Sequence, residues 1–125
     1  MRSLAPVASI AVAFLTSAAH AAPTSFTCKF PIEASPRGVV KQTSPFELRF
    51  VSDPGTKKAY ILGNNGSAEV RLIEHTFGVA FIEITATGNV MVTTIAKSGE
   101  AVHSRNTNLY GKLTPSQSYG TCTSE

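Results

Sequence analysis

The stretch VMVTTIAKSGEAVHSR, residues 90–105, has the pattern of two β-strands joined by a tight turn. β-Branched and other apolar residues dominate both halves, and Ser98-Gly99 stands between them. Glycine tolerates the positive φ that a two-residue hairpin loop requires, so we expect Ser98-Gly99 to form such a loop. This loop would place Ile95 directly opposite Val102 in an antiparallel pair.

The same rhythm of strand and turn continues along most of the chain. Turn-forming segments recur roughly every ten residues, as in an antiparallel meander, and runs rich in Val, Ile, Thr, Phe and Tyr lie between them. The turn segments are SDPGT at 52–56, GNNGS at 63–67, HTFG at 75–78, ATGN at 86–89 and KSGE at 97–100. No segment shows the period of an amphipathic helix. The sequence therefore predicts an all-β domain.

The lengths of these loops predict which side chains share the interior. We expect two-residue loops at Asn65-Gly66 and Gly88-Asn89, a three-residue loop at 75–77 and a four-residue loop at 53–56. With these registers, one entirely aliphatic row crosses six strands and faces inward, because side chains alternate between the two faces of a strand. The row consists of Leu48, Ile61, Val70, Ile82, Ile95 and Val102.

Strands at both ends complete the predicted domain. Residues 25–33 and the C-terminal segment SYGTCTS, 118–124, would run antiparallel and could pair. Their pairing would close a small up-and-down β-barrel of about eight strands, and a β-sandwich is the alternative. An interior filled with side chains is favoured over a hollow one. We expect residues 34–43 to form a loop, 108–113 a short strand and 114–117 a turn.

Cys28 and Cys122 are the two cysteines of the chain. In an exported protein the default expectation is one disulfide between them, which would fix the seam of the barrel. In the chain-entropy view, closing a loop of about 95 residues stabilises the fold by about 4–5 kcal/mol. The spacings that zinc sites show are absent around these cysteines, His75 and His103, so no metal site is expected.

The first residues have the composition of a secretory signal peptide. MRSLAPVASIAVAFLTSAAHA, residues 1–21, begins with Arg2, continues with a short apolar run and ends in small residues. A membrane span needs roughly 20 apolar residues, and the run is shorter. We expect cleavage after Ala21 or Ala22. The remaining single domain, residues 22–125, would be periplasmic or secreted.

The run His103-Ser104-Arg105 invites comparison with a catalytic site, but strand alternation argues against it. His103 and Ser104 must point to opposite faces of one strand, and the predicted register sends Ser104 inward and His103 outward. Asp53, the one aspartate, lies in a distant turn, so no Ser-His-Asp triad is expected. Glu69 and Glu83 would be solvated neighbours on the outer face. We expect no catalytic residues and no cofactor.

Two sets of residues remain as candidates for binding. The predicted outer face carries a row in which arginines and aromatic rings alternate, a composition found in protein-binding hot spots and also in ordinary sheet surfaces. This row is Arg49, Tyr60, Arg71 and Phe81. The second set, Ser116, Gln117 and Tyr119, would lie in a loop at one mouth of the barrel, where loops often carry function.

Residues 87–122, TGNVMVTTIAKSGEAVHSRNTNLYGKLTPSQSYGTC, resemble a group of small exported proteins of Gram-negative bacteria. The shared motifs are a Gly-x-Ala-Val-His-Ser-Arg run, then Pro-Ser-Gln and a closing Tyr-Gly-x-Cys. The resemblance implies export and no particular activity. In build, the chain is also similar to periplasmic lysozyme inhibitors, although their Ser-Gly-x-x-Tyr and Tyr-x-Cys-x-x-Gly motifs are absent.

The hypothesis from sequence is an exported, non-enzymatic β-barrel binding protein, acting as a monomer on an unknown protein or a small apolar ligand. A periplasmic inhibitor of an envelope-attacking hydrolase is one alternative. An envelope-structural protein, or an enzyme using residues 116–119, is another. The chain has eleven Lys and Arg against eight Asp and Glu, without charge runs, so neither nucleic acid nor a membrane surface is indicated as a partner.

Overall fold

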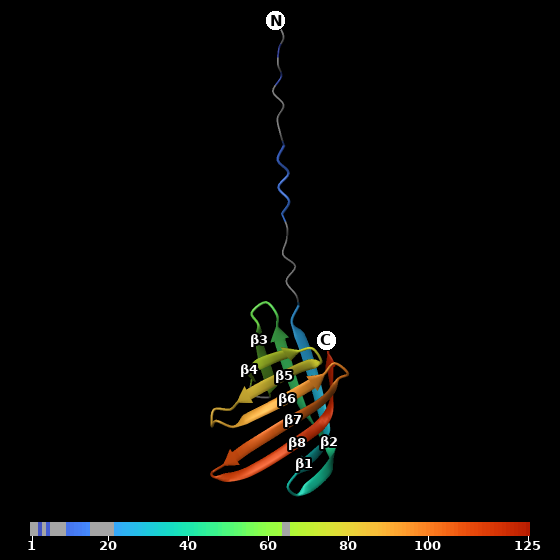
Figure 1. Cartoon of the computed structure of the whole chain (residues 1–125), viewed down its shortest axis with the longest axis vertical. Coiled ribbons are helices and arrows are strands. Elements are labelled where there is room, and N and C mark those ends of the chain that lie inside the picture. The colour runs from blue at the N-terminus through green and yellow to red at the C-terminus, as the bar shows by residue number, and fades with distance from the viewer. Residues whose placement is uncertain (1–2, 4, 6–9, 16–21, 64–65) are drawn as a thin grey trace.

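Eight strands form one closed antiparallel barrel in the computed structural model of the chain, which describes residues 3, 5, 10–15, 22–63 and 66–125 (Figure 1). Each strand pairs with the next, and the last pairs with the first. The strands are β1 (Thr24–Ser35), β2 (Gly38–Asp53), β3 (Lys58–Gly63), β4 (Gly66–His75), β5 (Gly78–Ile84), β6 (Val90–Ala96), β7 (Glu100–Leu109) and β8 (Lys112–Ser124). The predicted up-and-down barrel is confirmed, and the sandwich alternative is wrong.

The predicted signal peptide, residues 1–21, lies largely outside the described residues, so its cleavage stays a prediction. Residues 10–15 are described and belong to no strand. Among the described residues there is no helix of the length and apolar character needed to cross a membrane.

The barrel closes along β1 and β8. Cys28 stands directly opposite Cys122 in this pairing, and a disulfide joins the two buried residues. The strands approach closely here, because a Cβ added at Gly120 would collide with the backbone oxygen of Lys29. The predicted disulfide and its place at the seam are confirmed.

The β1–β2 and β7–β8 hairpins are longer than the sequence indicated. Residues 34–43, predicted as a loop, belong almost entirely to β1 and β2, with only residues 36–37 between the strands. The predicted turn at 114–117 lies inside β8, and the true turn is Tyr110-Gly111, where both residues have positive φ. The Asn108 side chain accepts a 2.8 Å hydrogen bond from the Gly111 amide and stabilises this turn.

The loop between β6 and β7 has three residues, 97–99, and not the predicted two. Gly99 has a φ of 91° and donates its amide to the Ala96 carbonyl, as in a three-residue hairpin loop that ends in a left-handed glycine. Thr93 consequently pairs with His103. The prediction that Ser104 and Val102 face inward is wrong, since the shift by one residue turns His103 inward.

The loop between β5 and β6 has five residues, 85–89, in place of the predicted two. Thr85 organises it, because its amide donates to the Asn89 carbonyl and its hydroxyl accepts from the Asn89 amide. This length makes Phe81, and not Ile82, face inward opposite Thr93. Phe81 is 1% exposed, so its predicted place on the outer face is wrong.

Strands β2–β4 keep the predicted facing, whereas the turn between β4 and β5 is one residue shorter than predicted and agrees with the reversed facing of β5. Leu48, Ile61 and Val70 face inward as expected, although Ile61 pairs with Phe50 and Ala68. The predicted loop at Asn65-Gly66 falls partly on residue 65, outside the described residues, and β4 already begins at Gly66. Between β4 and β5, His75 pairs with Gly78, which leaves a two-residue loop where three residues were predicted.

Aromatic rings fill the middle of the barrel. Phe50 and Phe81 stack with ring centroids 4.4 Å apart, and Phe26 packs edge-on against Phe81 at 5.6 Å. Phe30 is fully buried beside Phe46, with ring centroids 6.0 Å apart. The interior is therefore a packed core at this level, as the sequence led us to expect.

Candidate functional site

The candidate row of arginines and aromatic rings is only partly assembled. Arg49, Tyr60 and Arg71 occupy outward positions on β2, β3 and β4, and Tyr60 pairs with Glu69 across the sheet. Phe81 lies in the core instead. The expected neighbour relation between Glu69 and Glu83 is also wrong, because Glu83 takes an inward position on β5.

The second candidate set lies on strand β8 and not in a loop. Ser116 takes an inward position opposite Arg105, whereas Gln117 and Tyr119 point outward. The Tyr119 hydroxyl donates to Gln117 Oε1 at 2.6 Å, and Gln117 Nε2 donates to Ser104 Oγ at 3.3 Å. This chain of neutral hydrogen bonds runs across the outer surface of β7 and β8.

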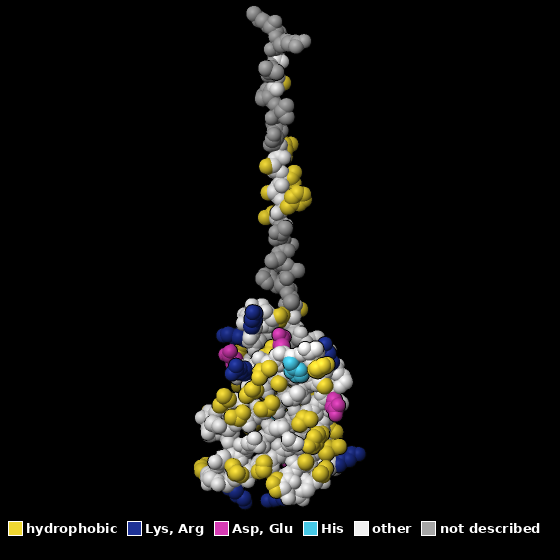
Figure 2. All heavy atoms as spheres, viewed as in Figure 1, with side chains coloured by type: hydrophobic (Ala, Val, Ile, Leu, Met, Phe, Trp, Pro, Cys, Tyr) yellow, Lys and Arg dark blue, Asp and Glu magenta, His cyan; other side chains and the backbone are white. Residues whose placement is uncertain are grey.

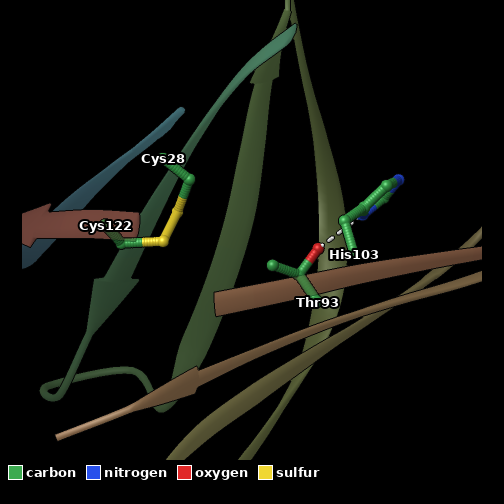
Figure 3. Close-up of a disulfide and its surroundings, with 4 residues drawn as sticks. All are labelled: Cys28, Thr93, His103 and Cys122. Atoms are coloured by element: carbon green, nitrogen blue, oxygen red, sulfur yellow. Dashed lines mark hydrogen bonds between the residues drawn. A yellow bond between two sulfur atoms is a disulfide. The ribbon is translucent and has the colours of Figure 1, made fainter. Parts of the chain in front are cut away.

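His103 lies in the interior, where the sequence placed Ser104. Its side chain is 2% exposed, and a 2.8 Å hydrogen bond joins His103 Nδ1 to Thr93 Oγ1 on the neighbouring strand (Figure 3). The rings of Phe30 and Phe46 lie within 6.0 Å of the imidazole ring centre. Burial, helped by the charge of Arg105, lowers the pKa of His103 to about 4. The histidine is a neutral core residue at physiological pH.

The part of the chain that the structure describes offers no metal site built from three His, Cys, Asp or Glu side chains. Asp53 ends β2, where its carboxylate accepts a hydrogen bond from the Gly55 amide. His103 and Ser104 point to opposite faces of β7, as strand alternation requires. Among the described residues, no serine and aspartate side chains combine with His103 into a Ser-His-Asp triad.

The outer surface of β5–β8 is the feature that sequence reasoning missed. In this fully described part of the chain, the side chains opposite to the buried Phe81, Thr93, His103 and Ser118 carry almost no charge. They are Gly78, Ala80, Ile82, Ile84, Val90, Val92, Thr94, Ala96, Val102, Ser104, Asn106, Asn108, Leu113, Pro115, Gln117, Tyr119, Thr121 and Thr123. Glu100, at one margin, is the single charged residue. We call this surface the neutral face.

The neutral face has an apolar centre and a polar margin. Its centre is a row in which Ala80, Thr94, Val102 and Tyr119 stand side by side across four strands. Figure 2 shows hydrophobic and uncharged side chains over the middle of this surface, with charged side chains toward its edges. By contrast, the outward positions of β2–β4 carry Glu47, Arg49, Asp53, Lys58, Glu69 and Arg71.

Correct facing of β5 and β7 would have revealed this surface from sequence. The prediction places Ile82 and Val102 in the interior because they are aliphatic, yet both point outward.

Comparisons with protein families, with curated proteins and with solved structures found no match to this chain.

Proposed function

We propose that this chain is an exported, non-enzymatic β-barrel protein that binds another protein through its neutral face. The observation that carries the proposal is the near absence of charge on the outer surface of four adjacent strands. Charged side chains are depleted at the centres of protein interfaces, because removing them from water without a counter-charge is costly. Soluble surfaces otherwise intersperse charges of both signs, as β2–β4 do.

The side chains of the neutral face suit burial against a partner. Ile82, Val92 and Val102 are already half-buried by their neighbours, and covering their remaining apolar surface would contribute about 25 cal/mol per Å². Gln117 and Tyr119 offer neutral hydrogen-bonding groups on β8. An apolar centre with a neutral polar rim is the usual anatomy of a protein interface.

The partner is expected to be a protein with an uncharged, concave surface. The barrel is closed and its outer surface is convex (Figure 1). Two convex barrels would touch over a narrow strip, whereas a stable interface buries about 800 Å² on each side. A concave partner can follow the curvature of β5–β8, so a second copy of this chain is the less suitable occupant.

Export is the second part of the proposal. The apolar residues Ile10, Val12, Phe14 and Leu15 are exposed and contribute nothing to the core. An apolar segment that the fold does not use is typical of a cleaved signal peptide. The disulfide agrees with an oxidising compartment.

Site-directed photo-crosslinking tests this function. A crosslinking amino acid at Thr94, in the centre of the neutral face, should join the protein to one defined partner in cells of the source organism. The same amino acid at Lys58, on the charged side, serves as the control and should give no such product. Absence of a Thr94-specific product, or a crosslinked homodimer alone, would contradict the proposal.

A further inference from the structure

An open cavity lies between the β1–β2 and β7–β8 hairpins at one end of the barrel. β1 and β2 stay paired as far as Ser35 and Gly38, and β7 and β8 as far as Leu109 and Lys112. The cavity between the two hairpins has a volume of about 750 Å³ and is lined by residues of both. We call it the arm cavity. It borders the neutral face at Leu113 and Pro115, which line both, whereas Arg105 takes an inward position on β7.

Arg105 is the distinctive residue of the arm cavity. It takes an inward position on β7, opposite Met91 and Ser116. Its Nε atom is buried, and no atom of the described residues accepts a hydrogen bond from it. A buried donor without an acceptor is unfavourable, and such groups in native proteins usually have a partner that the protein chain alone does not supply.

The surroundings of Arg105 favour an anion as that partner. Arg37 and Lys112 also line the cavity, and Glu33 is the one acidic residue among the lining side chains. One carboxylate oxygen of Glu33 already accepts a 2.7 Å hydrogen bond from Gln42. The cavity therefore combines three basic groups with one acidic group that is partly occupied.

We propose that the arm cavity binds a carboxylate through the guanidinium group of Arg105. A guanidinium fork matches the two oxygens of a carboxylate and can donate two parallel hydrogen bonds. The hydroxyl of Ser116, which stands opposite Arg105, can add a third donor. Val40 and Leu113 give the cavity apolar walls, which suit a ligand with a hydrocarbon part next to its carboxylate.

Two sources can supply this chemistry, namely a free organic acid or a glutamate side chain of a bound protein. Octanoate represents the first source, and a blocked peptide Ac-Ala-Glu-Ala-NH₂ the second. Each is titrated into the mature chain, residues 22–125, and followed by amide chemical shifts. We expect saturable shifts at the tips of the β1–β2 and β7–β8 hairpins with at least one of the two probes, and the responding probe identifies the source.

His103 gives an internal readout of the bound charge. It lies two positions before Arg105 on the same face of β7, and Arg105 contributes to lowering its pKa. A carboxylate on Arg105 would offset that positive charge. The pKa of His103 should consequently rise when the probe binds, a shift that a purely structural role of Arg105 would not produce.

Variants at Arg105 complete the test. Arg105→Gln should weaken binding of the probe about tenfold or more, and Arg105→Lys, which keeps the charge but lacks the fork, should weaken it less. Arg49→Gln makes the same change on the outer surface and should leave binding intact.

Three outcomes would overturn the carboxylate assignment: no saturable shifts with either probe, equal binding of octanamide or inorganic phosphate, and binding unchanged in Arg105→Gln. If Arg105→Gln fails to fold, the wild type saturated with the probe provides the test instead. An unchanged pKa of His103 in that complex would also overturn the carboxylate assignment. The crosslinking site Thr94 does not line the arm cavity, so the titrations at Arg105 succeed or fail independently of the proposed protein partner.

Discussion

His103 and Thr93 are two polar residues in a core that is mostly apolar. The two side chains face each other across β6 and β7, and each is 2% exposed. Their mutual hydrogen bond at 2.8 Å satisfies polar atoms that would be costly to bury alone. The arrangement holds the imidazole ring neutral, because the low-dielectric surroundings disfavour its charged form.

This burial predicts a loss of stability in acid. The pKa of His103 in the folded state is about 4, below its ordinary value of 6.5. Above pH 6.5 the histidine is neutral in both states and contributes no pH dependence. As the pH falls toward 4, the unfolded chain binds a proton that the folded chain does not, so the free energy of unfolding should decrease by up to about 3 kcal/mol.

Urea denaturation at a series of pH values measures this effect. Carboxylates titrate in the same range, so the contribution of His103 is the difference between the wild type and His103→Gln. The variant should show a flatter profile between pH 6.5 and 4 than the wild type. Parallel profiles for the wild type and His103→Gln would show that His103 is not buried as described.

At the scale of the strands, the sequence predicted their positions well and the facing of two of them wrongly. Turn residues and β-branched runs indicate where strands begin and end, and most of the predicted strands exist. The lengths of the three loops from β4 to β7 were predicted wrongly. Ser98-Gly99, for example, fits a two-residue or a three-residue loop equally well. A one-residue error reverses every side chain of a strand.

The hydrophobicity of the side chains is a test of which face of a strand points inward, and for a physical reason this test did not reveal the error. The test assumes one apolar and one polar face, but β5–β7 are largely uncharged on both faces. Ile82 and Val102 therefore looked like core residues, and the true inward row holds the polar Thr93 and His103. The apolar character of the neutral face explains the mistaken register, and it is also the basis of the proposed binding surface.

The corrected register is testable on β5. Phe81→Ala should lower the free energy of unfolding by about 3–5 kcal/mol, because it empties the centre of the aromatic cluster. Ile82→Ala, on the outer surface next to Phe81, should cost about 1 kcal/mol. Urea midpoints of the two variants give the comparison. If Ile82 faced the interior instead, Ile82→Ala would lower the free energy of unfolding more than Phe81→Ala.

At the scale of the whole molecule, the disulfide joins the first strand of the barrel, β1, to the last, β8. It spans 94 positions, so it restricts nearly the whole unfolded domain. The double variant Cys28→Ser/Cys122→Ser should lose about 4–5 kcal/mol in the chain-entropy view. Thermal unfolding of the wild type with and without reductant should show the same loss. A reduced wild type as stable as the oxidised one would mean that the β1–β8 seam holds without the bond.

The molecule as a whole has two unlike sides. β2–β4 carry the charges that keep a protein soluble, and β5–β8 carry the neutral face. The aromatic core and the disulfide fix both sides relative to each other. Such an arrangement presents a preorganised surface, which reduces the entropic cost of binding.

The affinity of the crosslinked partner for two matched variants tests this account most directly. Ile84 and Val39 are 71% and 73% exposed, and only Ile84 belongs to the neutral face. Ile84→Glu should weaken binding about tenfold or more, whereas Val39→Glu should leave the dissociation constant nearly unchanged. Equal affinities of the two variants for the partner would contradict the assignment of the neutral face as the binding surface.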